Sequence, residues 1–265
     1  MITTVKVQSE GKPKKLADKA QLPTHIMGIA GGLILWEAAY LVTGGNGFAH
    51  FWDVIWRVMQ FASQSEFWLS VGITFILTLG GLFGGVALAV VVGVPLAWNQ
   101  VLERETRWML LFARSVPSVA LLPLLMASFG SRTILVAVFV VWLVTIRMVF
   151  FVIRGVRDID RSLAEQAKLM CIGPIRKFLL IQFPAASSII LTGARLSIGL
   201  AYGAVVLAGL LAGTPGLGRD ISLASFAGET TSVLAYTVVA AFAGLAMFWL
   251  LQTIERRIIV WRNVA

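Results

Sequence analysis

Long apolar blocks separated by short polar segments make up most of this chain. No charged side chain occurs between Phe67 and Leu102 or between Thr230 and Ile254. A helix needs about 20 residues to cross a hydrocarbon layer of about 30 Å, because each residue advances it by about 1.5 Å. The pattern therefore predicts an all-α, polytopic membrane protein with about six transmembrane helices. The predicted spans are residues 26–43, 68–97, 108–129, 133–153, 187–212 and 233–254.

Composition supports this class and excludes several functions. Hydrophobic residues make up 58% of the 265 and charged residues only 13%, whereas a soluble domain has roughly 25% charged residues. The single cysteine, Cys171, excludes an internal disulfide and a cysteine-based metal cluster, and His25 and His50 are isolated. No nucleophile, base and orienting group occur at a recognisable spacing, so we expect no enzyme active site. The Gly-x-x-x-x-Gly-Lys-Ser/Thr loop that cradles phosphates is also missing, so the chain is not itself an ATPase.

The distribution of basic residues predicts the orientation of the spans. With the N-terminus inside, sixteen of the 22 lysines and arginines fall in internal segments, three in external segments and three within spans. Basic residues gather in cytoplasmic loops, so both termini are predicted to be cytoplasmic. The net charge of +9 then reflects these loops and not a surface for nucleic acid. Residues 1–25 form a basic tail without the apolar core of a cleavable signal peptide, and residues 256–265 form a second cytoplasmic tail.

The chain divides into a peripheral part and a core. Residues 26–67 hold the first span and an external amphipathic segment, and residues 68–255 hold the transmembrane core. Within the core, Gly80-Gly81 and Gly84-Gly85 leave a small-residue face that packs against another helix, either in the same chain or in a second copy.

Two external segments are not ordinary loops. Apolar and aromatic residues recur at helical spacing within residues 48–68, which predicts a helix lying in the outer interface with its tryptophans at headgroup level. The polar residues Glu229–Thr231, before the last span, either contact an external protein or cap the helix that follows.

The internal segment from Arg154 to Pro184 carries most of the functional information. It is long and basic, and apolar residues recur along one face of its first half. Gly173-Pro174 ends this first helix, because proline lacks a backbone donor and clashes with the preceding turn. A second short helix is predicted from Ile175 to Phe183. Such a helix–turn–helix either docks into a groove of a soluble partner or lies in the interface without a partner.

Motifs in and around this segment resemble a known family. Glu165-Gln166-Ala167, followed by Ile181-Gln182-Phe183-Pro184, resembles the EAA motif of ABC importer permeases in residues and in spacing. Arg114-Ser115-Val116-Pro117 and Gly155-Val156-Arg157-Asp158 resemble the third span and the run into the motif in one branch, the nitrate/sulfonate/taurine permeases. Gly216-Leu217-Gly218 is similar to the outer turn of that branch. The likeness covers about residues 70–262.

The resemblance implies a type I ABC importer permease-like fold and a non-catalytic role as the membrane subunit of an ATP-driven importer in the bacterial inner (plasma) membrane. It also implies three partners: ABC ATPase subunits that bind ATP and Mg, a second permease chain expected to be identical, and an extracytoplasmic solute-binding protein. A coupling loop at residues 157–184 would contact the ATPase and pass its movement to the spans. The residues that the resemblance assigns to this contact are Arg161, Glu165, Ala167, Cys171, Gly173, Ile181 and Pro184.

The chain departs from the family pattern at a few positions. Cys171 stands where the motif has glycine, and Phe183 stands where it has leucine. Gly209 occupies a position near the end of the fifth span where many relatives carry an acidic residue, and Arg219-Asp220 replaces an aromatic residue. The last two lie on or near the predicted path, so the resemblance leaves the substrate open.

Three arginines, Arg114, Arg147 and Arg195, lie in the inner halves of their predicted spans. A charge at a helix centre costs about 2.5–3.5 kcal/mol, so each needs a partner or a function. The three either form a positive belt that attracts an anion, or extend to the inner headgroups or bind helix-end carbonyls. The resemblance implies that such an anion is nitrate, a sulfonate or taurine. Glu37 in the first span is a candidate partner. The alternative function is a secondary transporter or channel that works without ATP, which predicts acidic relays in mid-span and no long basic docking loop.

Overall fold

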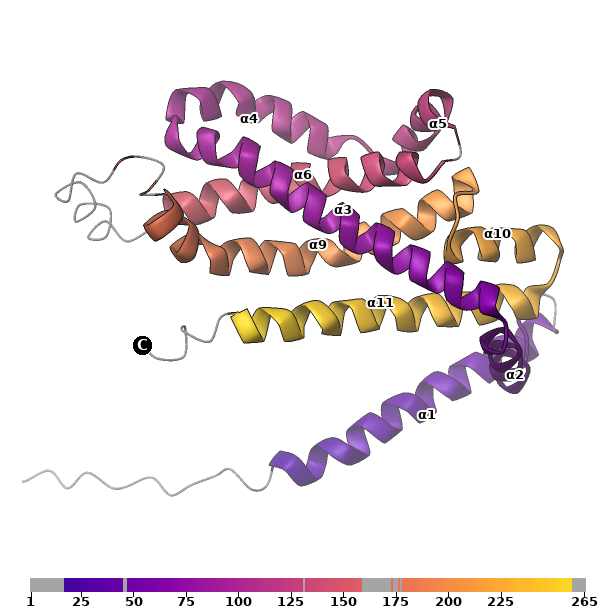
Figure 1. Cartoon of the computed structure of the whole chain (residues 1–265). Helices are drawn as coiled ribbons and strands as arrows, with labels where there is room; N and C mark the ends of the chain where they lie inside the picture. The colour runs from indigo at the N-terminus through magenta and orange to yellow at the C-terminus, as the bar shows by residue number, and fades with distance from the viewer. Residues whose placement is uncertain are drawn as a thin grey trace, which may run out of the picture.

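The computed structural model describes residues 17–44, 47–130, 132–158, 173, 176 and 178–258, which form helices and turns with no β-strand among them. The helices are α1 (Ala17–Thr43), α2 (Phe51–Ala62), α3 (Ser65–Trp98), α4 (Gln100–Ser115), α5 (Ser118–Phe129), α6 (Thr133–Arg157), η1 (Phe178–Gln182), α9 (Phe183–Ala212), α10 (Leu217–Phe226) and α11 (Thr230–Ile258). Helices α3, α6, α9 and α11 run along the length of the molecule, and the short helices α2, α5 and α10 lie toward the end where α3 begins (Figure 1). The predicted all-α, polytopic fold is confirmed.

Fewer helices are long and apolar enough to cross a membrane than the six that the apolar pattern predicts. Four helical stretches are long and apolar enough to cross a membrane: Ser65–Trp98, Thr133–Arg157, Leu179–Phe226 and Thr230–Glu255. Helices α4 and α5 make a fifth if the bent pair counts as one span, and α1 contains a shorter apolar stretch, Ala30–Thr43. Each predicted span thus coincides with helical structure, but the apolar part of the first is short and the third is broken.

The prediction of one continuous helix over residues 108–129 is wrong. The chain forms α4 and α5 there, and the two axes differ by 88°. Val116 has an extended conformation, with φ −65° and ψ 124°, and Pro117 occupies the N-cap position of α5. A residue before proline is disfavoured in the helical region, and the proline ring cannot continue the helical hydrogen bonds. The bend therefore follows directly after Arg114.

Glycines bring α3 and α6 into close contact at the centre of the core. A Cβ atom on Gly85 would lie 2.5 Å from Cβ of Val144, and one on Gly81 would overlap Val140. The hydroxyl of Thr145 donates to the Gly85 carbonyl at 3.2 Å. These positions must lack a side chain for the two backbones to approach. The small-residue face of α3 is therefore used for packing within the chain.

A second close approach explains one departure from the family pattern. The turn at Gly216 leads into α10, a helix that the apolar pattern does not predict. A Cβ atom on Gly209 of α9 would lie 2.8 Å from the Cα of Gly218, and one on Gly218 would overlap the carbonyl oxygen of Val206. An acidic side chain at position 209 would displace α10, so glycine is required there by packing.

The external amphipathic segment forms α2, which is shorter than the predicted stretch of residues 48–68. It buries Val54 and Phe61, and the Phe61 ring stacks on Tyr236 of α11 with centroids 4.3 Å apart. Trp52 and Trp56 stay 74% and 66% exposed on its other face. The helix therefore has the apolar outward face that an interfacial position requires.

Candidate functional site

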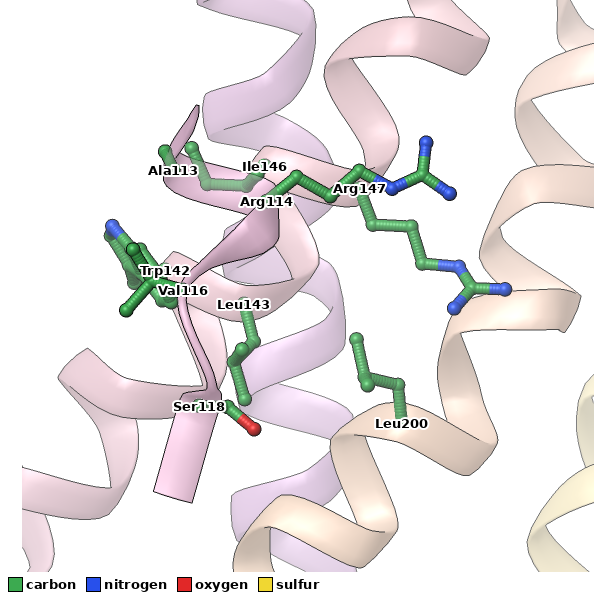
Figure 2. Close-up of a pocket in the computed structure, with 9 residues that line it drawn as sticks. All are labelled: Ala113, Arg114, Val116, Ser118, Trp142, Leu143, Ile146, Arg147 and Leu200. Atoms are coloured by element: carbon green, nitrogen blue, oxygen red, sulfur yellow. The ribbon is translucent and has the colours of Figure 1, made fainter. Parts of the chain in front are cut away.

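A pocket of about 190 Å³ opens where α4 ends, beside α6 and α9. Its lining residues are Ala113, Arg114, Val116, Ser118, Trp142, Leu143, Ile146, Arg147 and Leu200. The break between α4 and α5 shapes one wall, because it brings Arg114 and Ser118 to the same space that Arg147 of α6 faces. The side chains of Arg114 and Arg147 extend toward the same side, where the ribbon of α9 carries Leu200 (Figure 2).

The two arginines of this pocket have no carboxylate partner among the residues that the structure describes. Arg114 is exposed and Arg147 is half-buried. The Cζ atom of Arg114 lies 5.7 Å from the centroid of the Phe150 ring, within the range of a cation–π contact. Within the described part of the chain, no carboxylate forms an ion pair with either arginine. Two neighbouring guanidinium groups in a partly enclosed space attract an anion and can bind it by charge-assisted hydrogen bonds.

The third predicted arginine does not join this pocket. Nη1 of Arg195, on α9, lies 3.2 Å from Oε2 of Glu255 on α11, and the two side chains are 33% and 13% exposed. Glu37, the predicted candidate partner of an intramembrane arginine, has other contacts. It accepts a hydrogen bond from the backbone N–H of Phe51 at 3.1 Å and lies 2.9 Å from Nδ1 of His50. Glu37 therefore ties α1 to the start of α2, and it pairs with none of the three arginines for which it was a candidate partner.

The predicted ATPase-contact residues fall mostly outside the described residues. These are Arg161, Glu165, Ala167 and Cys171. Gly173 is exposed, Ile181 lies in the π-helical turn η1, and Pro184 is the second residue of α9. Proline is tolerated there because the N–H groups of the first turn have no partner within their own helix. The predicted helix end at Phe183 is wrong, since α9 begins at that residue.

At the end of the molecule where α2 lies, Arg57 connects α2 to α11. Its Nη2 lies 2.8 Å from Oε2 of Glu229, and its Nε donates to the hydroxyl of Ser232 at 3.0 Å. That hydroxyl donates to the same Glu229 oxygen at 2.6 Å. The Ser232 hydrogen bond first, and Arg57 second, lower the pKa of Glu229 below its ordinary value. Glu229 thus holds two helices together at the edge of a depression of about 530 Å³ that Trp56 also lines.

Sequence reasoning did not identify two groups that define these sites. Glu255 follows the last predicted span and directly precedes Arg256-Arg257, so the sequence does not show that it faces Arg195 of α9. Ser118 lines the pocket because of the 88° bend between α4 and α5, and the signal for that bend is Pro117 after an extended residue. Among the described residues, no group of three or more His, Cys, Asp or Glu side chains is arranged to hold a metal ion.

Comparison with known proteins places this geometry in a family. The family model described as "Binding-protein-dependent transport system inner membrane component" matches residues 81–260. The chain is 27% identical over 245 residues to a probable ABC transporter permease protein of Brucella abortus, covering 92% of this chain and 96% of that protein. It is 28% identical over 187 residues to the putative aliphatic sulfonates transport permease protein SsuC of Bacillus subtilis, covering 69% of this chain and 66% of that protein.

The fold is similar to that of a solved transporter. A chain of the inward-facing MetNI methionine ABC transporter superimposes with a TM-score of 0.64 at 20% sequence identity, covering 76% of this chain and 96% of that chain. At this identity the likeness shows the fold, which is the importer-permease fold predicted from the motifs. The family model matches well over half of the chain. The chain therefore belongs to the family of binding-protein-dependent transport system inner membrane components.

Proposed function

We propose that this permease subunit forms the translocation path for a small anionic solute and couples to a separate ATPase through the loop at residues 157–184. The observation that carries the solute class is the presence of Arg114 and Arg147 in one pocket without a carboxylate partner among the described residues. Nitrate, an aliphatic sulfonate or taurine each present oxygens of the kind that guanidinium groups bind.

The pocket suits an oxyanion in its hydrogen-bonding groups as well as its charge. Each guanidinium carries five N–H donors in a planar fork that matches a group with several oxygens. Ser118 adds a hydroxyl at the first residue of α5, and the N-terminus of that helix carries partial positive charge. The Bacillus subtilis relative is named for aliphatic sulfonates, which have a terminal group of this geometry.

The position of the loop supports its role in coupling. It connects α6, which carries Arg147, with α9, which carries Leu200 on another side of the pocket. The EAA-like residues Glu165 and Ala167 lie within it. A displacement of the loop by a docked ATPase would therefore act on two helices that line the pocket.

The remaining assignments concern the assembly, in which this chain is non-catalytic. ATP and Mg are bound by ABC ATPase subunits, a second permease chain of identical sequence completes the path, and an extracytoplasmic solute-binding protein delivers the solute. Helix α4 buries none of its sixteen residues, which leaves a face for that second chain. The complex resides in the bacterial inner membrane.

The test is to purify the tagged chain from its native membrane, reconstitute it with the proteins that co-purify, and measure anion uptake and ATP hydrolysis together. Glu165→Ala, in the EAA-like run, is expected to lose hydrolysis-driven uptake because it removes the loop's acidic docking group. Glu105→Ala is the matched control, since Glu105 is an exposed glutamate on α4.

Three outcomes separate the parts of the proposal. An ATPase that co-purifies with the wild type and supports anion uptake, with coupling lost in Glu165→Ala alone, supports both parts. Coupled uptake only of solutes that carry no anionic group would contradict the anion assignment. A chain that purifies without ATPase activity and transports solute down an ion gradient would overturn the coupling role.

A further inference from the structure

Arg157, the last residue of α6, binds the end of α3 and the start of α4 with three nitrogens of one guanidinium. We call this region, residues 96–103, the α3–α4 corner. Nε donates to the carbonyl of Ala97 at 3.1 Å, and Nη2 donates to the carbonyl of Leu96 at 3.2 Å. Nη1 donates to Oε2 of Glu103 at 3.0 Å. A single side chain therefore holds two helix ends together.

The charges at this corner match the helix ends that they contact. Carbonyls in the last turn of a helix lack partners in that helix and carry partial negative charge, so the cation of Arg157 is favourable at the end of α3. Glu103 lies in the first turn of α4, where a negative charge is favourable, and the Asn99 side chain caps the same turn. Glu103 also lies 3.6 Å from Arg107 and is only 15% exposed, while Arg157 is 31% exposed. The carboxylate of Glu103 is therefore shielded from water, whereas its contact with Arg157 stays open to solvent.

The same corner also holds the other end of the loop. Nε1 of Trp98, the last residue of α3, donates to Oε1 of Gln182 at 2.9 Å. Gln182 ends η1, and α9 follows directly. The ends of α3 and α6 and the turn η1 lie together at one end of the molecule (Figure 1). Both sides of the segment between Arg157 and Gln182 are therefore fastened to the α3–α4 corner.

We propose that Arg157 and Glu103 are positioning residues for coupling, which tie the base of the loop to α4 and thereby to Arg114. This inference rests on the proposed function of the loop. Glu103 and Arg114 lie eleven residues apart on one helix, a distance of about 16 Å along its axis. Helix α4 buries none of its residues in the chain, and the extended Val116 separates it from α5. A movement of the corner is thus carried along α4 to the pocket.

The experiment measures solute molecules imported per ATP hydrolysed by the assembled importer in proteoliposomes. Arg157→Lys keeps the charge, but an ammonium cannot bind three acceptors in the geometry of the guanidinium fork. Glu103→Gln keeps the shape and removes the charge. Arg154→Gln is the control, because Arg154 lies one turn earlier on α6 and its one ion pair among the described residues is with the exposed Asp158.

We expect Arg157→Lys and Glu103→Gln to assemble with the ATPase and hydrolyse ATP, with the import-per-ATP ratio lowered about tenfold by the lost charge-assisted contacts. Arg154→Gln should keep the wild-type ratio. An unchanged ratio in both corner variants overturns the assignment, as does a parallel fall of uptake, hydrolysis and thermal stability at constant ratio. An equal fall in Arg154→Gln also overturns it. A wild-type chain without an associated ATPase fails at an earlier step and refutes the proposed function itself.

Discussion

Arg147 and Arg195 are the same residue type in neighbouring helices, yet their surroundings differ. Arg195 of α9 faces Glu255 of α11, whose nearer oxygen is 3.2 Å away. Among the described residues this oxygen accepts no hydrogen bond, so the contact is one between charges. Arg147 of α6 faces a pocket that it shares with Arg114, and no described carboxylate pairs with it.

The difference separates an arginine that is paired within the chain from one that has no carboxylate partner among the described residues. A shielded charge loses hydration, and a partner of opposite charge offsets that loss within the chain. Arg195 has such a partner, so its charge is accounted for. At Arg147 the lost hydration has to be offset by water in the pocket or by a bound anion. Depth in the membrane does not distinguish the two residues, but the identity of the facing group does.

The largest expected effect concerns Arg147, the arginine without a described carboxylate partner. Arg147→Gln removes a charge that contacts the solute in the proposed function, and Arg114→Gln removes the second. Each change should raise the KM for the anionic solute about 10- to 100-fold, the range that corresponds to one charge-assisted hydrogen bond. Uptake by the reconstituted importer at varied solute concentration measures this effect.

The control is the double substitution R195Q/E255Q, which removes the paired charges together and leaves two neutral groups in contact. It should keep the wild-type KM, because neither residue lines the pocket. If this pair raises KM as much as Arg147→Gln does, the distinction between the two arginines is wrong.

The next effect concerns the ion pair between Arg195 and Glu255. Glu255→Gln alone leaves the charge of Arg195 in a half-buried site without an opposite charge among the described residues. We expect the free energy of unfolding to fall by about 1–2 kcal/mol, a value moderated by the water that reaches Arg195. Thermal unfolding in detergent measures the change.

The double substitution R195Q/E255Q should recover much of this loss, because a buried charge is no longer left unpaired. If the single and double variants both unfold at the wild-type temperature, the ion pair contributes nothing to stability and Arg195 needs another explanation.

The apolar pattern predicted the helical fold because the spans are long and contain few charged residues. Its errors occur where a local backbone effect overrides hydrophobicity. Val116-Pro117 breaks a predicted span between Ser115 and Ser118, and hydrophobic periodicity alone does not show that the helix axis bends there. Helix α10 was missed for a related reason, since it begins at a glycine turn whose function is close packing against Gly209. Both signals were present as glycine and proline residues, but their consequences depend on tertiary contacts.

The candidate site was predictable only in part. The sequence identified three arginines because charges within apolar stretches are rare, but it could not pair them. Pairing depends on which helices are neighbours, and the partner of Arg195 lies sixty residues away in Glu255. Arg114 and Arg147 meet because the chain bends after α4, which the pattern did not show. The positions of the helices, and not the residue types, decide which arginine has a carboxylate partner and which arginines line the pocket.

The smallest expected effect concerns Arg57, a third arginine, whose pair lies outside the spans. Glu229 has a lowered pKa in the folded protein, so its charged form stabilises the contact between α2 and α11. This contribution is fully present above the ordinary pKa of 4.5 and is lost as the pH falls through the lower folded pKa. Glu229→Gln should therefore lower the unfolding temperature slightly at pH 7, and the difference from the wild type should disappear in acid. A difference that persists below the folded pKa would show that shape and hydrogen bonding, rather than charge, hold α2 to α11, and Arg57 would then no longer belong with Arg195 as a charge-paired arginine.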